Sequence, residues 1–437
     1  MSASWPEDLD LLDAIGPWLY SRRWFPGQKG DQIRVLDTVD LSALSVADPA
    51  NEPVEPVWIS LIEVGENLLS VPLVYTDQAP SSGVVAHVRD AWIVDGAYSP
   101  LFLRAWIREA YTDGTISPLA PEQARTIRDR LLQVADQTHV ISGEQSNTSV
   151  VFPGEAACVV KFLRVLHPGV HPELEVTQAL AATGWECVAT PVLYAQLQPR
   201  GEAREPFVYA IGGALVRDGR DGFELFVQMA REGADPAALA HSLGRVTAQM
   251  HERLADAFGA SESMATSEFA QRLTANIQAA SAEVPALKER DFDQQLIAAV
   301  HEVENLSELP PVIRVHGDYH LGQTMHSDAG WTVLDFEGEP LRSLADRRQK
   351  DFALRDVAGM LRSFDYAGAK ASAGAAWTQA AQDAFLNGYT SGGGLGPVEQ
   401  VMLRALLVEK ATYETVYEYR MRPEWIDIPL RALKNLT

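Results

Sequence analysis

One segment constrains the fold of this chain more than any other. Residues 312–339 read VIRVHGDYHLGQTMHSDAGWTVLDFEGE, and they interrupt a second half whose apolar residues otherwise recur at helical spacing. Within the segment, TMH and WTVLDF have strand character and flank SDAG, which has the composition of a tight turn. We therefore expect a helix-rich lobe that carries a β-hairpin.

Three side chains around this hairpin suggest a chemistry. Asp318 and Gln323 precede the hairpin, and Asp335 ends it. Transfer of the γ-phosphate of ATP requires a carboxylate that orients the attacking hydroxyl and accepts its proton, together with bound Mg²⁺. Mg²⁺ prefers hard oxygen ligands, which Gln323 and Asp335 both offer. Asp318 is therefore the candidate base, and the other two are candidate metal ligands.

The rest of the chain divides into three expected parts. Residues 1–90 form a small cap module with polar, Pro-rich linkers, and its strand-like runs are Ile33–Asp40, Val57–Val64 and Leu68–Tyr75. Residues 91–213 mix helix and strand and include an antiparallel meander, whereas residues 214–437 are mainly helical. A strand-rich lobe before a helix-rich lobe predicts an α+β, bilobal architecture.

The strand-rich half contains candidate contacts for a nucleotide. Lys161 lies mid-strand between apolar neighbours, where an ammonium is costly unless it has a partner, although a surface lysine at a strand edge is the alternative. The turn SGEQSN can bring backbone N–H groups over phosphates, with Ser142 and Ser146 as the candidate contacts. Asp218 follows the strand YAIGGALV, where we expect a hinge that offers backbone groups to adenine.

The last long helical pattern, Leu403–Tyr419, suggests an acceptor site. Aromatic and charged residues recur there at three- and four-residue spacing, namely Lys410, Tyr413, Glu414 and Tyr417. Such side chains stack on sugar rings and bond their hydroxyls, but an ordinary amphipathic helix with ion pairs explains Lys410 and Glu414 nearly as well. Further candidates for contact with an acceptor are His320, Glu409 and Trp425.

Composition excludes several classes of partner. The formal charge of −23 argues against nucleic acid and anionic membranes, because neither phosphate array would be attracted. No apolar run is long enough to span a bilayer, and the acidic N-terminus has no basic region of the kind that opens a secretory signal. Two cysteines support no disulfide framework. We expect a cytoplasmic protein whose oligomeric state the sequence does not define.

The motifs together resemble a known family. HGDYHLGQ, DFEGEP and RDVAGMLRSFDYA are similar to segments of the aminoglycoside-phosphotransferase-like kinases, and within them of the actinobacterial maltokinases and glucosamine kinases, from about residue 130 onward. The resemblance implies a bilobal, eukaryotic-protein-kinase-like fold that uses ATP and Mg²⁺, with Asp318 as base and Gln323 and Asp335 as metal ligands. Gln323 stands where the broader superfamily has Asn. The resemblance also implies that Lys161 binds the α- and β-phosphates and pairs with a helical glutamate, for which Glu175 fits the motif better than Glu173.

The resemblance leaves the acceptor open. Glucosamine, phosphorylated at its 6-hydroxyl, and maltose, phosphorylated at its anomeric hydroxyl, are the substrates of two similar branches. We favour glucosamine, because the carboxylates of the final helix (Glu409, Glu414, Glu418) suit an ammonium-bearing sugar. A catalytically silent pseudokinase that binds nucleotide or sugar is disfavoured, since no expected functional residue is lost. A protein kinase is disfavoured because only about a dozen residues, with no APE-like segment, lie between DFEGEP and the helix LRDVAGML, which leaves little room for a loop on which a peptide could dock.

Overall fold

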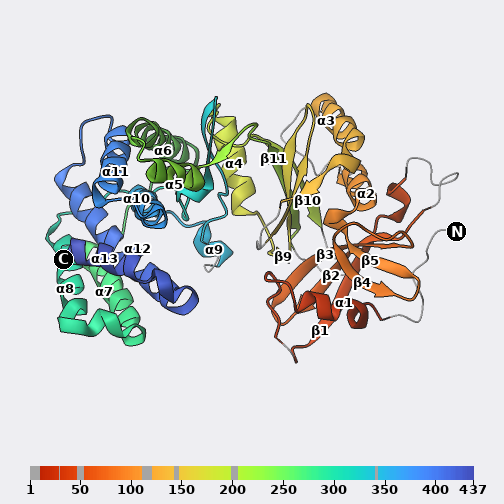
Figure 1. Ribbon diagram of the computed structural model, residues 1–437, viewed down its shortest axis with the longest axis horizontal. Helices are drawn as coiled ribbons and strands as arrows, with labels where there is room; N and C mark the ends of the chain where they lie inside the picture. The colour runs from red at the N-terminus through yellow and green to blue at the C-terminus, as the bar shows by residue number, and fades with distance from the viewer. Residues whose placement is uncertain are drawn as a thin grey trace. The chain divides into compact units, whose positions relative to one another are not determined.

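The computed structural model describes residues 10–28, 30–46, 54–110, 121–141, 147–197, 205–339 and 343–437 (Figure 1). The chain divides into two compact units. The first comprises Met1–Gln178 and Ala189–Leu215, and the second comprises Ala179–Val188 and Val216–Thr437.

Two antiparallel sheets build the first unit. One has the strand order β1-β2-β3-β5-β4, with β9 also paired to β3, and the other has the order β10-β11-β8-β7-β6. The strands are β1 (Ile33–Asp40), β2 (Val57–Val64), β3 (Asn67–Thr76), β4 (Val84–Val88), β5 (Ala91–Asp95), β6 (His139–Val140), β7 (Asn147–Phe152), β8 (Cys158–Leu163), β9 (Val165–Leu166), β10 (Pro191–Leu197) and β11 (Phe207–Ala214). The helices are α1 (Leu11–Leu19), α2 (Pro100–Ala110), α3 (Pro121–Gln133) and α4 (Pro172–Ala182), which ends in the second unit.

The predicted strands of the cap module are present, and the sheet shows why they are so apolar. Strand β2 is buried on both faces, so it reads as a near-continuous apolar run. Its residues Ile59 and Leu61 join the core shared by the two sheets and α2, whereas Ile62 packs with Ile15 of α1 in a second core. The same sheet includes β5, beyond residue 90.

A buried arginine joins the two sheets. Arg164, between β8 and β9, is fully buried and its guanidinium lies 2.6 Å from Asp95 at the end of β5. It also donates to Thr148 of β7 at 2.8 and 2.9 Å. A buried guanidinium requires such partners, and here they tie elements of both sheets together.

Helices dominate the second unit. They are α5 (Gly222–Glu232), α6 (Ala237–Phe258), α7 (Thr266–Glu283), α8 (Phe292–His301), α9 (Leu344–Arg347), α10 (Ala353–Ala371), α11 (Ala375–Tyr389), α12 (Pro397–Met421) and α13 (Asp427–Leu436). Helices α6 and α11 pack backbone to backbone, because a Cβ on Gly244 would lie 2.0 Å from the carbonyl oxygen of Phe385. Among the described residues, no helix is long and apolar enough to cross a membrane.

A three-stranded antiparallel sheet carries the predicted hairpin. Its order is β12 (Arg220–Asp221), β13 (Thr324–Ser327) and β14 (Gly330–Val333). The α+β class is confirmed: antiparallel sheets dominate the first unit, and helices with one small hairpin dominate the second.

Candidate active site

The loop that carries Asp318 is held by α10. Asp356 is buried, and its carboxylate accepts the backbone N–H groups of His316 at 2.8 Å and Gly317 at 3.0 Å. His251 of α6 lies 3.1 Å from the same carboxylate through Nε2, and its Nδ1 lies 3.0 Å from the Tyr389 hydroxyl. These bonds fix the backbone immediately before Asp318.

The electrostatics of Asp356 favour its charged form. Burial by itself would raise the pKa of this carboxyl. The hydrogen bond and charge of His251, the charge of His316 and the N–H of Gly317 outweigh burial and lower the pKa below its usual value. Asp356 is thus an ionised acceptor at neutral pH.

The loop also packs tightly against α10. A Cβ on Gly359 would lie 2.5 Å from the carbonyl oxygen of Tyr319, so only glycine admits this approach. The Tyr319 hydroxyl lies 3.0 Å from the Thr247 hydroxyl of α6. Asp318 is therefore flanked on both sides by residues anchored in the helical core.

The two candidate metal ligands lie side by side. The side-chain amide of Gln323 donates to Asp335 at 3.0 Å. His316 holds the strand end before Asp335, because its Nε2 lies 2.8 Å from the carbonyl oxygen of Leu334. Asp335 itself has a φ of 62°, a left-handed conformation that is costly outside glycine and is found at functional sites. The oxygens of this pair are the hard donors that Mg²⁺ prefers, so the residues fit the ion.

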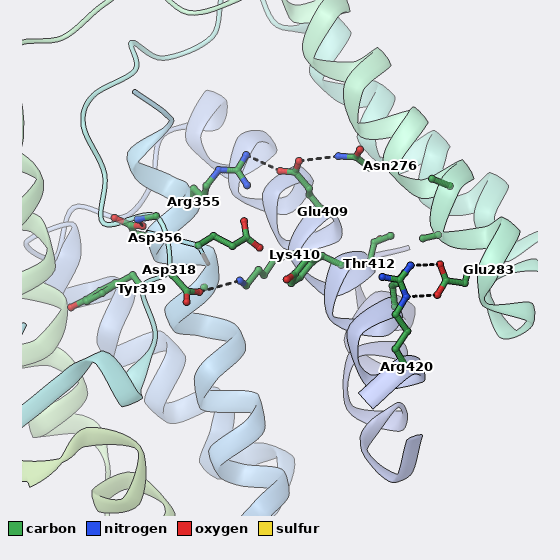
Figure 2. Close-up of a pocket in the computed structure, with 17 residues that line it drawn as sticks. Asn276, Glu283, Asp318, Tyr319, Arg355, Asp356, Glu409, Lys410, Thr412 and Arg420 are labelled. Atoms are coloured by element: carbon green, nitrogen blue, oxygen red, sulfur yellow. Dashed lines mark hydrogen bonds and ion pairs between the residues drawn. The ribbon is translucent and has the colours of Figure 1, made fainter. Parts of the chain in front are cut away.

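Asp318 opens into a pocket of about 450 Å³ formed by the helical unit (Figure 2). The Lys410 ammonium, from α12, lies 3.8 Å from the Asp318 carboxylate and 5.4 Å from the centre of the Tyr413 ring. Tyr413 also lines the pocket and hydrogen-bonds Glu339, which lies in the segment after Asp335. Two candidates of the final helix, Lys410 and Tyr413, thus share one pocket with Asp318.

Glu409 lines the pocket too, but its charge is already matched. Its carboxylate lies 2.9 Å from the guanidinium of Arg355 and accepts from Asn276 at 3.2 Å. A cationic acceptor would therefore not meet Glu409 as an isolated charge.

The other acceptor candidates lie elsewhere. Glu414 is turned to α10, where the Arg362 guanidinium lies 2.8 Å away, and burial raises its pKa despite that charge. Trp425 stacks on Tyr366 with ring centres 6.0 Å apart. Tyr417 lies under the guanidinium of Arg422 at 5.2 Å. None of these candidates lines the Asp318 pocket.

His320 is turned into its own loop. Its Nδ1 accepts the N–H of Gly322 at 3.1 Å, which caps the short helical turn that ends at Gln323. Burial lowers the pKa of His320, against the opposing charge of Asp318, so the imidazole is neutral at neutral pH. Its observed contact positions the turn before the hairpin.

In the first unit, Lys161 has a carboxylate partner, but it is not the predicted one. The Lys161 ammonium on β8 lies 2.9 and 3.0 Å from the two carboxylate oxygens of Glu173, not of Glu175. Helix α4 begins at Pro172, and two positions apart on a helix differ by about 200°, so Glu173 and Glu175 point in different directions. The predicted pairing with Glu175 is therefore wrong.

The remaining nucleotide candidates are less defined. Asp218 has a φ of 52° and lies between β11 and β12, in the expected hinge segment. Ser142 and Ser146 lie outside the residues that the structure describes.

Comparison with known proteins decides the family. The model of a family described as "Phosphotransferase enzyme family" matches residues 138–399, more than half of the chain. The chain belongs to this family. The predicted kinship with aminoglycoside-phosphotransferase-like kinases is thereby confirmed.

Two curated relatives of this phosphotransferase are both named glucosamine kinase. A glucosamine kinase of Streptacidiphilus jiangxiensis is 28% identical over 319 residues, which cover 67% of this chain and 72% of that protein. A glucosamine kinase of Mycolicibacterium smegmatis is 27% identical over 334 residues, which cover 70% of this chain and 82% of the relative.

Solved structures support the fold over the full length of the phosphotransferase. A glucosamine kinase in complex with glucosamine, ADP and inorganic phosphate is 22% identical, with a TM-score of 0.63 and coverage of 100% of both chains. A second structure, of glucosamine kinase in crystal form B, has a TM-score of 0.61 at 22% identity and covers 93% of this chain and 94% of its own.

Sequence reasoning missed several residues at this candidate site. Asp356 could have been identified from the sequence, because an aspartate among the apolar residues of RDVAGML must have hydrogen-bond or charge partners if it is buried. Three further residues that line the pocket have no such signal in the sequence, namely Asn276, Glu283 and Arg420. Polar and charged residues of this kind are common on the exposed faces of ordinary helices.

Proposed function

We propose that this phosphotransferase transfers the γ-phosphate of ATP to the 6-hydroxyl of glucosamine. The observation that carries the proposal is the position of Asp318, whose carboxylate lines a pocket of a size suited to a small polar ligand. The names of the two curated relatives support glucosamine as the acceptor. The reaction belongs in the cytoplasm, where ATP is available.

Asp318 orients the acceptor hydroxyl and accepts its proton. As the hydroxyl oxygen bonds to the γ-phosphorus, the bond from that phosphorus to the bridging oxygen of ADP breaks, so the products are the sugar phosphate and ADP. Gln323 and Asp335 would hold Mg²⁺, which neutralises charge on the phosphates when bound. Lys410, 3.8 Å from Asp318, keeps a positive charge at the place where the phosphoryl group arrives.

Each of the three expected parts of the chain has a role in this reaction. Residues 1–90 form the cap module, residues 91–213 include the nucleotide-binding lobe, and residues 214–437 bind the acceptor. The Lys161–Glu173 pair supports a nucleotide role for the middle part, with Lys161 on the α- and β-phosphates. Ser142, Ser146 and Asp218 stay candidate contacts of ATP, and Glu414, Tyr417 and Trp425 stay candidate contacts of the acceptor.

A panel of sugars tests the acceptor. Consumption of ATP is measured with glucosamine, glucose, N-acetylglucosamine and maltose, and the phosphorylated position is read by NMR. We expect the highest kcat/KM for glucosamine and a product phosphorylated at the 6-hydroxyl. Equal values for glucosamine and glucose would remove the role of the amine, and a preference for maltose would make the protein a maltokinase. Nucleotide binding without turnover of any sugar would indicate a pseudokinase.

A further inference from the structure

The pocket extends well past Asp318 along a groove between α7 and α12. One face of α7 lines it, since Asn276, Ala279, Ala280 and Glu283 recur at three- and four-residue spacing. The two alanines have the smallest side chains that a helix face can present apart from glycine, so they leave the floor of the groove open. The groove is therefore formed by the regular side-chain spacing of the two facing helices.

The far end of the groove is closed by an ion pair. The Arg420 guanidinium of α12 lies 2.6 Å from each carboxylate oxygen of Glu283, in a two-pronged contact. Along α12, Lys410 and Arg420 are separated by about 15 Å of helix rise. Figure 2 shows the Glu283–Arg420 pair on the side of the pocket away from Asp318. The helix rise of about 15 Å between Lys410 and Arg420 exceeds the length of one pyranose ring.

The groups between these ends suit a second sugar ring. Tyr413 is 38% exposed and, with Val416, gives the groove an apolar surface on which a ring can stack. Arg420 and Glu283 remain 60% and 34% exposed, so free N–H groups and oxygen lone pairs are open to hydroxyls. Asn276 lies along the same wall. An apolar face edged by paired donors and acceptors matches the surface of a pyranose.

We infer that the groove is a second sugar subsite, and that the preferred acceptor is an amino-sugar disaccharide whose far ring lies between Tyr413 and the Glu283–Arg420 pair. The inference rests on the proposed function for the identity of the ring beside Asp318. The far ring adds contacts in the groove and does not change the chemistry at Asp318.

Two acceptors and one double variant test the subsite. We expect kcat/KM for the β-1,4-linked dimer of glucosamine to exceed that for glucosamine by about tenfold or more. In Glu283→Gln/Arg420→Gln, which removes both charges and leaves neither unpaired, the ratio of the two values should fall to about one. The matched control, Lys370→Gln/Glu224→Gln, removes an ion pair that lies outside the pocket, with its charged groups 2.7 Å apart, and should keep the wild-type ratio.

Calorimetry without ATP separates this inference from the proposed function. Tighter binding of the dimer than of glucosamine, lost in the double variant, supports the subsite even if neither sugar is phosphorylated. Equal affinities and equal kcat/KM values for dimer and monomer would overturn it. So would a double variant that retains the preference for the dimer.

Discussion

The carboxylate of Asp356 accepts the backbone N–H of His316 at 2.8 Å, so a buried charge of α10 holds the loop that carries Asp318. Gly317 donates to the same carboxylate, and His251 supports it from α6. Because Asp356 bonds this loop through the backbone N–H groups of His316 and Gly317, it is a positioning residue. Its effect on turnover must pass through the placement of Asp318.

Asp356→Asn should therefore impair both stability and turnover. An amide offers one oxygen, and its NH₂ group would face a backbone donor, which leaves a buried N–H without an acceptor at a cost of about 1–3 kcal/mol. The measurements are the free energy of unfolding in denaturant and kcat with glucosamine. A variant with wild-type stability and kcat would show that the loop does not depend on this carboxylate.

The same carboxyl predicts a dependence of stability on pH. Its pKa is lower in the folded protein than the usual 3.8, so the unfolded state takes up a proton more readily. The contribution of Asp356 to the free energy of unfolding is thus complete above pH 3.8, and it is lost as the pH falls through the lower folded-state pKa. Unfolding curves of wild type and Asp356→Asn should converge in acid and differ most near neutrality. A constant difference over this range would contradict the lowered pKa.

Asp318→Asn tests the base. Turnover should fall by at least about 10²-fold, the scale of a general base, while the fold and ATP binding are kept. Asp328→Asn makes the same chemical change at an exposed position of the hairpin turn and should leave kcat unchanged. Near-wild-type turnover in Asp318→Asn would refute the proposed mechanism.

Asp335→Asn tests the metal site. Activity should be abolished by EDTA and restored by Mg²⁺, and the variant should need at least about tenfold more Mg²⁺ for half-maximal rate, because it loses a charged ligand. Titration of Mg²⁺ at saturating ATP and glucosamine measures the change. Full activity after removal of all divalent ions would exclude Gln323 and Asp335 as functional metal ligands.

The local features of this chain could be predicted from its sequence. The strand runs of the cap module and the hairpin around SDAG depend on neighbouring residues, and β1, β2 and β13 appear where the patterns place them. Strand β14 ends at Val333, three residues before the end of the predicted run WTVLDF. Helix α12 likewise contains the predicted Leu403–Tyr419 and continues beyond it at both ends. Alternation, turn composition and helical spacing are properties that a short segment carries by itself.

The direction of single side chains could not be predicted in this way. Glu414 and Lys410 lie on one helix face by spacing, yet Glu414 pairs with Arg362 while Lys410 faces Asp318. The groove beyond Asp318 depends on how α7 packs against α12, which only the tertiary structure defines. Helix spacing names the residues that can share a face, but packing decides which partner each of them meets.

The partner of Lys161 provides the last test, because sequence and structure point to different glutamates. The Lys161–Glu173 contacts of 2.9 and 3.0 Å predict that Glu173 holds the ammonium in place for the phosphates of ATP. Glu173→Gln removes the charge but keeps the size of the side chain, and kcat/KM for ATP should fall by about tenfold or more. Glu175→Gln makes the identical change two positions along α4 and serves as the matched control, with a much smaller expected effect. A greater loss in Glu175→Gln than in Glu173→Gln would mean that the pairing observed here is not the one used with ATP bound.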